Sequence, residues 1–210
     1  MPYQTVGSLH LDFDGINEYN DYYRDLDIEK AIATTRFTAN GVTYTREAYT
    51  SFPDQVLVIR LTASQKKSIS FTAKYSTPYK SSVIRCISPR KELQLNGKAN
   101  DHEGIEGKVE FTALTRIENN GGKLEILSDS TLQVKDANSV ILYVSIGTNF
   151  VNYKDVSGDA LNSAQQYLKL VNKNYPKSKA SHINAYRKYF NRVSLNWEVM
   201  LRSISRRMYV

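Results

Sequence analysis

The chain has 210 residues, 41% of them hydrophobic, so it is long enough to bury one large core. Lys and Arg outnumber Asp and Glu by 28 to 21, but the basic residues stand in scattered pairs such as Lys66-Lys67 and Arg206-Arg207, with acidic residues between them. A nucleic-acid surface requires a continuous basic stripe, so this distribution argues against a nucleic-acid partner and favours solvated strand edges.

The sequence also argues against a membrane partner, because no stretch approaches the ~18 consecutive apolar residues of a spanning helix. The N-terminus, "MPYQTVGSLHLDF", has neither the basic nor the apolar region of a signal peptide. We therefore expect a soluble chain without an export signal, and its location stays open. Cys86 is the one cysteine and cannot form an intramolecular disulfide, so we expect it to act as a small buried hydrophobe.

From Val6 to Phe150 the apolar residues alternate or form short runs separated by turn residues, a pattern typical of a β-sandwich or barrel. Asn40-Gly41 predicts a type I′ turn that pairs residues 34–39 antiparallel with 42–50. After a turn at Pro53-Asp54, "QVLVIRLTA" is apolar almost throughout, which predicts a strand buried on both faces. Further strands are predicted at 69–75, 92–95, 108–117, 123–127, 131–134 and 139–145.

After Phe150 the apolar spacing becomes helical. We expect helices at about 159–174, capped by Gly158-Asp159, and at about 179–193, with Pro176 separating them. Four apolar side chains should turn toward the sandwich: Leu168, Ile183, Tyr186 and Phe190. The predicted organisation is a β-sandwich domain at 1–157, a helical linker region at 158–195 and an atypical tail at 196–210.

Acidic residues and histidines give no convincing catalytic or metal site. Asp12 and Asp14 would lie on one face of a strand, whereas a glycosidase pair must flank the substrate, so a turn beside Gly15 is the preferred interpretation. The histidines His10, His102 and His182 lie in three different kinds of segment. The loop "NDHEGIEG" at 100–107 lacks zinc and EF-hand spacing, which favours a solvated loop over metal binding. We predict no catalytic residue, cofactor or metal, and the binding residues stay unknown.

Two arginines, Arg24 and Arg46, lie inside strand-like segments and must find a partner or reach a rim. The local candidates are Asp25, Asp27 and Glu47. Pairing between side chains is a commoner use of such residues than ligand recognition, so we favour the structural interpretation.

Several segments together resemble the N-terminal β-sandwich of glycoside hydrolase family 95, the α-L-fucosidase and α-L-galactosidase group. They are "YQTVGSLHLDF", "YYRDLDIEKAIATTRFTANGVTYTREAYTSFPDQVLVIRLTAS", "GGKLEI", "ILYVSIGTNF" and "HINAYRKYFNRVSL", of which the second is the most specific. The resemblance implies a mainly β fold: an antiparallel super-sandwich that lacks its first strands, followed by two C-terminal helices. It also implies that the catalytic groups belong to an (α/α)6 barrel absent from this chain, and that family members are commonly periplasmic or secreted.

Three functions stay open. The first is a non-catalytic fragment whose partner is the missing barrel, and it predicts an apolar face without its partner. The second is a stand-alone carbohydrate-binding module that holds a glycan on surface tyrosines such as Tyr19, Tyr22 and Tyr79, and it predicts a flat aromatic platform. The third is an enzyme that acts alone, and it predicts convergent carboxylates in a cleft.

The resemblance stops after Leu195, and the tail "NWEVMLRSISRRMYV" suggests a one-base frameshift near Asn196. Read from the third base of the Asn196 codon, the codons for Asn-Trp-Glu encode the Leu-Gly that the family has at this point. The same frame allows Asp-Val-Arg at 208–210. We expect genomic reads across this site to show barrel-like sequence in the shifted frame, and its absence would contradict the hypothesis.

Overall fold

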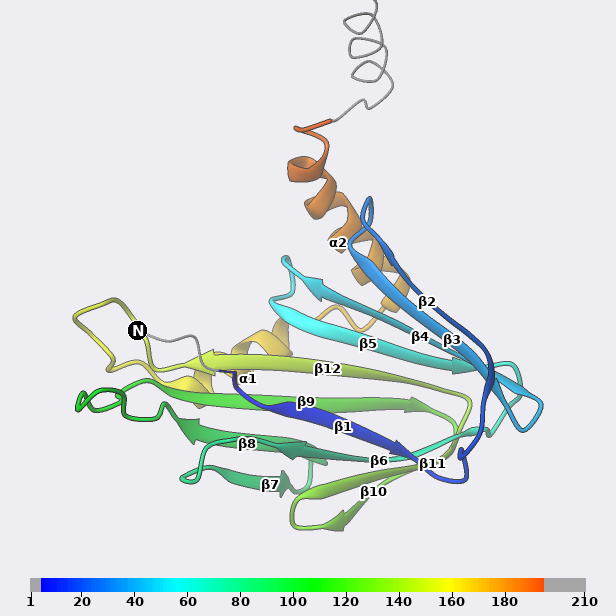
Figure 1. Cartoon of the computed structure of the whole chain (residues 1–210), viewed down its shortest axis with the longest axis horizontal. Helices are drawn as coiled ribbons and strands as arrows, with labels where there is room; N and C mark the ends of the chain where they lie inside the picture. The colour runs from blue at the N-terminus through cyan, green and yellow to red at the C-terminus, as the bar shows by residue number, and fades with distance from the viewer. Residues whose placement is uncertain (1–4, 195–210) are drawn as a thin grey trace, which may run out of the picture.

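The computed structural model describes residues 5–194, which form two antiparallel β-sheets and two C-terminal helices (Figure 1). The small sheet has the order β1-β6-β11-β10 and the large sheet has the order β2-β3-β4-β5-β12-β9-β8-β7. The expected mainly β, sandwich-like fold is therefore confirmed. The strands of the small sheet are β1 (Ser8–Phe13), β6 (Ile69–Ser76), β10 (Lys123–Ser128) and β11 (Thr131–Ala137). Those of the large sheet are β2 (Asn20–Asp27), β3 (Ile32–Ala39), β4 (Val42–Ser51), β5 (Val56–Ala63), β7 (Val83–Ile87), β8 (Glu92–Lys98), β9 (Glu110–Asn120) and β12 (Ser139–Thr148).

The hairpin at Asn40-Gly41 forms as predicted. Asn40 has φ 51° and Gly41 has φ 73°, the positive values that a type I′ turn requires, and Ala39 pairs with Val42 across it. The Asn40 side chain also donates a hydrogen bond of 3.0 Å to the carbonyl of Gly15, which fixes the loop after β1 against this turn.

The central strands of the large sheet are buried on both faces, because a core lies on each side of them. One core fills the space between the two sheets, and the other lies between the large sheet and the helices. Strand β5 contributes to both: Leu61 belongs to the inter-sheet core, and Val58 belongs to the core under the helices. The prediction that this strand is buried on both faces is confirmed, and the alternation of side chains along a strand is the reason.

The helices are α1 (Ala160–Leu170) and α2 (Tyr175–Phe190), and Asp159 caps α1 as expected. The break between them was predicted at Pro176, but that residue lies inside the first turn of α2. A proline is tolerated there because the first helical N–H groups have no partner within the helix. Asn174 caps α2 instead, by accepting a hydrogen bond from the backbone of Lys177.

The predicted inward side of the helices is largely confirmed. Leu168 is fully buried, while Ile183, Tyr186 and Phe190 are half-buried and Arg187 and Lys188 are exposed. His182 of α2 is also buried, although the spacing of apolar residues does not predict a buried histidine at this position.

The edges of the large sheet are β2 and β7. Arg24 was placed in a strand-like segment, but no bounds were predicted for β2, and β7 was missed. β2 is mostly exposed and β7 is partly exposed, and their sequences "NDYYRDLD" and "VIRCI" lack a clean alternation of apolar and polar residues. Edge strands bury little side chain, so their apolar pattern is weak.

Within residues 5–194, neither helix is long and apolar enough to cross a membrane. Cys86 is half-buried and packs against the inter-sheet core, as expected for a small hydrophobe. The domain boundaries stay predictions, and the tail at 196–210 lies outside the described residues.

The inter-sheet core predicts where the fold is most sensitive to truncation. Replacing Leu142, which is fully buried, by alanine should lower the free energy of unfolding by about 2–5 kcal/mol, because a cavity remains between the sheets. Leu127→Ala, at an exposed position, is the matched control and should change it by less than about 0.5 kcal/mol. Urea unfolding of both variants tests this, and equal losses would show that the two sheets do not share a packed core.

Candidate functional site

Glu47 on β4 holds α2 against the outer face of the large sheet. Its carboxylate accepts hydrogen bonds from the Lys179 ammonium group and, at 2.9 Å, from the Tyr175 hydroxyl. Arg60 on β5 lies 3.9 Å from the same carboxylate and places its guanidinium over the Tyr175 ring, 4.6 Å from the centroid. We call this group of Glu47, Arg60, Tyr175 and Lys179 the helix clamp.

The charge of Glu47 is stabilised by these partners. Burial on its own would raise the pKa of the carboxyl group, but the hydrogen bonds and charges of Lys179, Tyr175 and Arg60 outweigh it and hold the pKa below its ordinary value. Burial, together with the bond to Glu47, raises the pKa of the Tyr175 hydroxyl. The clamp therefore consists of an ionised carboxylate, two cations and a neutral phenol.

A second polar group lies beside the clamp. Asp54, in the turn between β4 and β5, accepts hydrogen bonds from Ser51 at 2.7 Å and from Ser178 of α2 at 2.9 Å. The Tyr49 hydroxyl lies 3.2 Å from the Ser178 hydroxyl, and the Tyr49 ring stacks on the His182 ring with centroids 4.6 Å apart. These contacts join α2 to β4 through buried polar groups that satisfy one another.

Helix α1 is held by a separate ion pair. Arg116 on β9 donates two hydrogen bonds to Glu92 on β8, at 2.7 and 2.9 Å, and a third to the carbonyl of Leu168 near the end of α1. Glu92 is almost fully buried, and each of its oxygens has a cationic partner: Oε1 accepts both bonds from Arg116, and Oε2 lies 3.7 Å from Nε of Arg90.

Exposed apolar side chains lie near the end of α2 and in the β2–β3 turn that it contacts. Tyr186 donates a hydrogen bond to the carbonyl of Ile28, and the side chains of Ile28, Tyr189 and Val193 are exposed. We call Ile28, Tyr189 and Val193 the α2 apolar patch. A partly apolar helical surface is what the accessory-domain interpretation predicts.

The predicted carboxylate pair does not form a catalytic arrangement. Asp12 on β1 is paired with Lys74 at 2.8 Å, and Asp14 lies in the turn that follows. Two further acids, Glu110 and Asp159, line a hollow of about 340 Å³. Asp159 is the cap of α1, because its side chain accepts a hydrogen bond from the backbone of Asn162.

The predicted partners of the two arginines are wrong. Asp27 pairs with Lys30 at 2.6 Å, and Glu47 belongs to the helix clamp on the opposite face from Arg46. Successive residues of a strand point to opposite faces, so Arg46 cannot meet Glu47. The Nε atom of Arg46 is buried without a hydrogen-bond partner in the part of the chain that the structure describes, and burial lowers the pKa of the guanidinium.

The predicted glycan-binding tyrosines do not form one surface. Tyr79 is buried, only 5% exposed, with its ring edge-on to Phe111, so its assignment to a surface is wrong: Tyr79 belongs to the inter-sheet core. Tyr19 and Tyr22 are exposed, but their rings are tilted by 51°, which is not a flat platform. They line a hollow of about 450 Å³ together with Phe13 and Phe37.

The histidines are engaged in separate contacts. His10 lies 2.6 Å from the Ser76 hydroxyl, and His182 lies 3.0 Å from the carbonyl of Lys30. His102 is in the 100–107 loop, 3.8 Å from Glu103. Among residues 5–194, no group of three or more His, Cys, Asp or Glu side chains could hold a metal ion.

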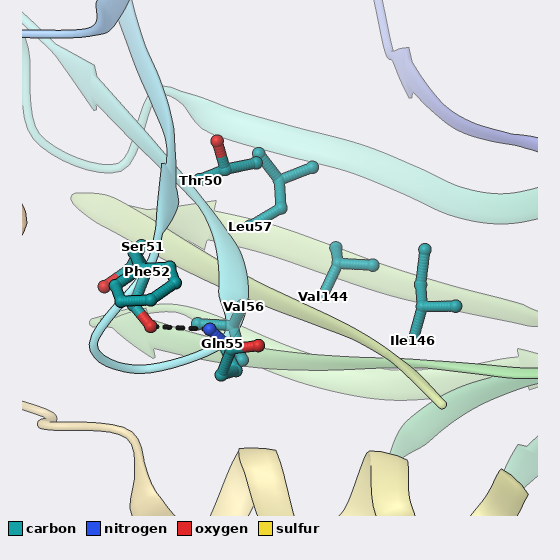
Figure 2. A pocket seen from close by; sticks show the side chains of 8 residues that line it. All are labelled: Thr50, Ser51, Phe52, Gln55, Val56, Leu57, Val144 and Ile146. Carbon is teal, nitrogen blue, oxygen red and sulfur yellow. Dashed lines mark hydrogen bonds between the residues drawn. The ribbon is translucent and has the colours of Figure 1, made fainter. Parts of the chain in front are cut away.

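Part of the inner face of the large sheet is hollowed. Figure 2 shows a hollow of about 380 Å³ in which the side chains of Leu57, Val144 and Ile146 point away from the helices. Val56, Thr50, Ser51, Phe52 and Gln55 complete the lining. In Figure 1, β2, β3 and β4 extend beyond β1, the last strand of the small sheet on this side.

The helix clamp predicts a pH-dependent stability. Glu47→Gln should lower the free energy of unfolding by about 1–3 kcal/mol at pH 7, because Lys179 loses its charged partner. Since the pKa of Glu47 is lower in the folded chain, its contribution is complete above about pH 4.3, the unfolded value, and is lost as the pH falls through the folded value. The variant should therefore lose less stability than the parent below pH 4.3.

Urea unfolding between pH 7 and pH 3 measures this effect. Glu125→Gln, which neutralises an exposed carboxylate on β10, is the control and should follow the parent curve. Parallel curves for the parent and Glu47→Gln would contradict the role of the clamp.

Comparisons with known proteins place the chain in a family. Residues 1–153 match the family model described as glycosyl hydrolase family 65, N-terminal domain. The chain is 30% identical over 228 residues to alpha-L-fucosidase 2 of Arabidopsis thaliana, covering 92% of this chain and 26% of that protein. It is 24% identical over 204 residues to the probable alpha-fucosidase A of Aspergillus niger, covering 92% of this chain and 25% of that protein.

A solved structure shares the fold: a putative kojibiose phosphorylase from human microbiome has a TM-score of 0.51 at 14% identity, over 87% of this chain and 27% of that one. The chain spans about a quarter of the length of the curated relatives that match most of it. The expectation of a glycoside hydrolase N-terminal domain is confirmed at that level, while the matching model is that of family 65. With 153 of its 210 residues matched, the chain belongs to the family of glycosyl hydrolase family 65 N-terminal domains.

Proposed function

We propose that the chain is the non-catalytic N-terminal domain of an α-L-fucosidase-type enzyme of glycoside hydrolase family 95, and that it supports an (α/α)6 catalytic barrel. The observation that carries the proposal is the match to two proteins named as fucosidases. Each aligns with 92% of this chain, yet only about a quarter of each is covered. We assign the catalytic groups of such an enzyme to the part that this chain does not match.

The contacts of the described residues support a structural role. The buried or bonded acids at the helix face serve the fold: Glu47 and Asp54 hold α2, and Glu92 holds α1 through Arg116. A glycosidase requires two carboxylates on opposite sides of a sugar. Where two acids do line one hollow, Asp159 already caps a helix.

The α2 apolar patch is the surface that we assign to the barrel. Tyr189 lies in the last turn of α2 and Val193 follows the helix, so the chain beyond residue 194 continues from this surface. Ile28 extends the patch onto the β2–β3 turn. A partner that covers the end of α2 and the β2–β3 turn together would hold the helix and the sheet in one orientation. An accessory domain can stabilise a neighbouring domain in this way.

A domain exchange tests the proposal. We expect the purified chain to release no fucose from an aryl α-L-fucoside, and a chimera that joins it to the remainder of the Arabidopsis fucosidase to be soluble and active. Tyr189→Asp should reduce the yield of active chimera, because it places a charge in the apolar patch. Lys188→Asp, at the neighbouring exposed position, is the matched control and should have little effect.

Two outcomes would contradict the proposal. One is turnover by the isolated chain that a substitution within it abolishes. The other is an active chimera whose yield Tyr189→Asp and Lys188→Asp leave equally unchanged.

A further inference from the structure

A polar hollow of about 340 Å³ lies at the start of α1, next to the end of β8 and the beginning of β9. Four polar side chains line it: Asn96, Glu110, Thr112 and Asp159. Within residues 5–194, the lining includes no Lys, Arg or His. Pockets for small molecules usually measure about 300–1,000 Å³, so this hollow has room for a small ligand.

The walls of the hollow are held by close packing and by hydrogen bonds. Gly147 of β12 has no side chain, and a Cβ atom there would clash with the carbonyl oxygen of Ala160, so the start of α1 rests directly on the sheet. The Asn149 side chain accepts a hydrogen bond of 2.8 Å from the backbone N–H of Glu110. The carbonyl of Asn149 accepts one of 2.9 Å from Gly158, which precedes the N-cap of α1. The segments that carry the two acids are therefore joined through one residue, and the site is preorganised.

The amide of Asn96 is oriented by two buried side chains. Its Oδ1 atom accepts hydrogen bonds from Nε2 of Gln94 and from Oγ1 of Thr112, both of 2.9 Å. Gln94 is only 2% exposed and Thr112 only 4%. An amide oxygen has two lone pairs, and here both are used, so the amide nitrogen is the part of Asn96 that can bind a ligand. Asn96 therefore offers donors and no acceptor to this hollow.

The two acids supply the acceptors. Oδ1 of Asp159 accepts the capping bond from the backbone of Asn162 at 2.9 Å, and the other carboxylate oxygen can accept a bond from a ligand. Glu110 has an exposed side chain, so its carboxylate is accessible from the solvent. Two carboxylates disfavour an anionic ligand, and the N–H groups of Asn96 disfavour a metal cation. The remaining match is a neutral ligand whose groups both donate and accept hydrogen bonds.

We propose that this hollow binds one pyranose ring of a carbohydrate through two neighbouring hydroxyl groups. One hydroxyl accepts a hydrogen bond from the Asn96 amide and donates to a carboxylate, and the next hydroxyl donates to the other carboxylate. The site includes none of the tyrosines predicted to bind a glycan. It lies wholly within the described residues, so it does not depend on the proposed role of the chain as a support for a barrel.

Titration of the ¹⁵N-labelled chain with simple glycosides tests the proposal. The probes are methyl α-L-fucopyranoside, methyl β-D-galactopyranoside and methyl α-D-glucopyranoside, which differ in the geometry of their neighbouring hydroxyls. We expect at least one of them to shift the side-chain NH₂ signal of Asn96 and the backbone amide signals of residues 158–161, with saturation in the millimolar range. The control ligand is 2-methoxytetrahydropyran, which has the same ring without hydroxyl groups and should shift neither.

Three variants separate the site from general adhesion. Asn96→Asp still accepts the bonds from Gln94 and Thr112 but loses the NH₂ group, so it should weaken glycoside binding about tenfold. Glu110→Gln should also weaken it, because an ionised acceptor is lost. Glu103→Gln removes the same charge from an exposed acid in the 100–107 loop, outside the hollow, and should bind as the parent does. Circular dichroism and urea unfolding verify that each variant is folded.

Three results would overturn the proposal. The first is that none of the glycosides shifts these signals at concentrations up to the solubility limit. The second is equal affinity in the parent, Asn96→Asp and Glu110→Gln. The third is that calcium chloride shifts the same signals and competes with the glycoside, because the hollow would then be a cation site.

Discussion

Every strand in the middle of the large sheet must be apolar on both sides, and the rest of the structure follows from this constraint. Val58 of β5 and Tyr143 of β12 face the helices, while Leu61 and Leu142 face the small sheet. If either face were left in water, several large apolar side chains would be exposed. Each Å² of exposed apolar surface would cost about 25 cal/mol of folding free energy. A layer is therefore required on both sides, and the helices and the small sheet supply these layers.

The two layers are attached in different ways. The small sheet is held mainly by apolar packing, with one buried polar contact where the Tyr75 hydroxyl lies 2.6 Å from that of Thr115. Burial raises the pKa of Tyr75 to about 12, so this hydroxyl stays protonated and able to donate. The helices depend in addition on ionic contacts, at Glu47 for α2 and at Glu92 for α1. Charge-assisted hydrogen bonds depend on direction, so these contacts add a fixed orientation to the apolar packing of the helices.

The ionic contacts fit the proposed role of α2. A helix that positions a neighbouring domain must keep one orientation, and the clamp of Glu47 with Lys179, Tyr175 and Arg60 provides it. The inner face beside β1 has the opposite character. Leu57, Val144 and Ile146 line an open hollow there, and among residues 5–194 the buried Nε of Arg46 has no hydrogen-bond partner. The large sheet thus has one face held to α2 by ionic contacts and one face that is partly exposed beside β1.

The sequence by itself determined the local elements. The Asn40-Gly41 turn, the two-sided burial of β5 and the Asp159 cap each depend on a few neighbouring residues, whose conformational preferences act without distant contacts. The bounds of edge strand β2 were not predicted and β7 was missed, because an edge buries little side chain and so leaves a weak pattern. The resemblance to a glycosidase accessory domain also rests on contiguous sequence segments, so it could be seen without the structure.

Only the tertiary structure decided which polar groups meet. Glu47 and Lys179 are 132 residues apart, and neither position signals the other, so the nearby Arg46 looked like the natural partner. Because side chains alternate along β4, Arg46 faces the small sheet and Glu47 faces α2. The position of Tyr79 was also decided by the tertiary structure. It was predicted as a surface tyrosine that could bind a glycan, but it packs on Phe111 inside the core. Contacts between distant segments depend on sheet order and layer stacking, and these are properties of the folded chain as a whole.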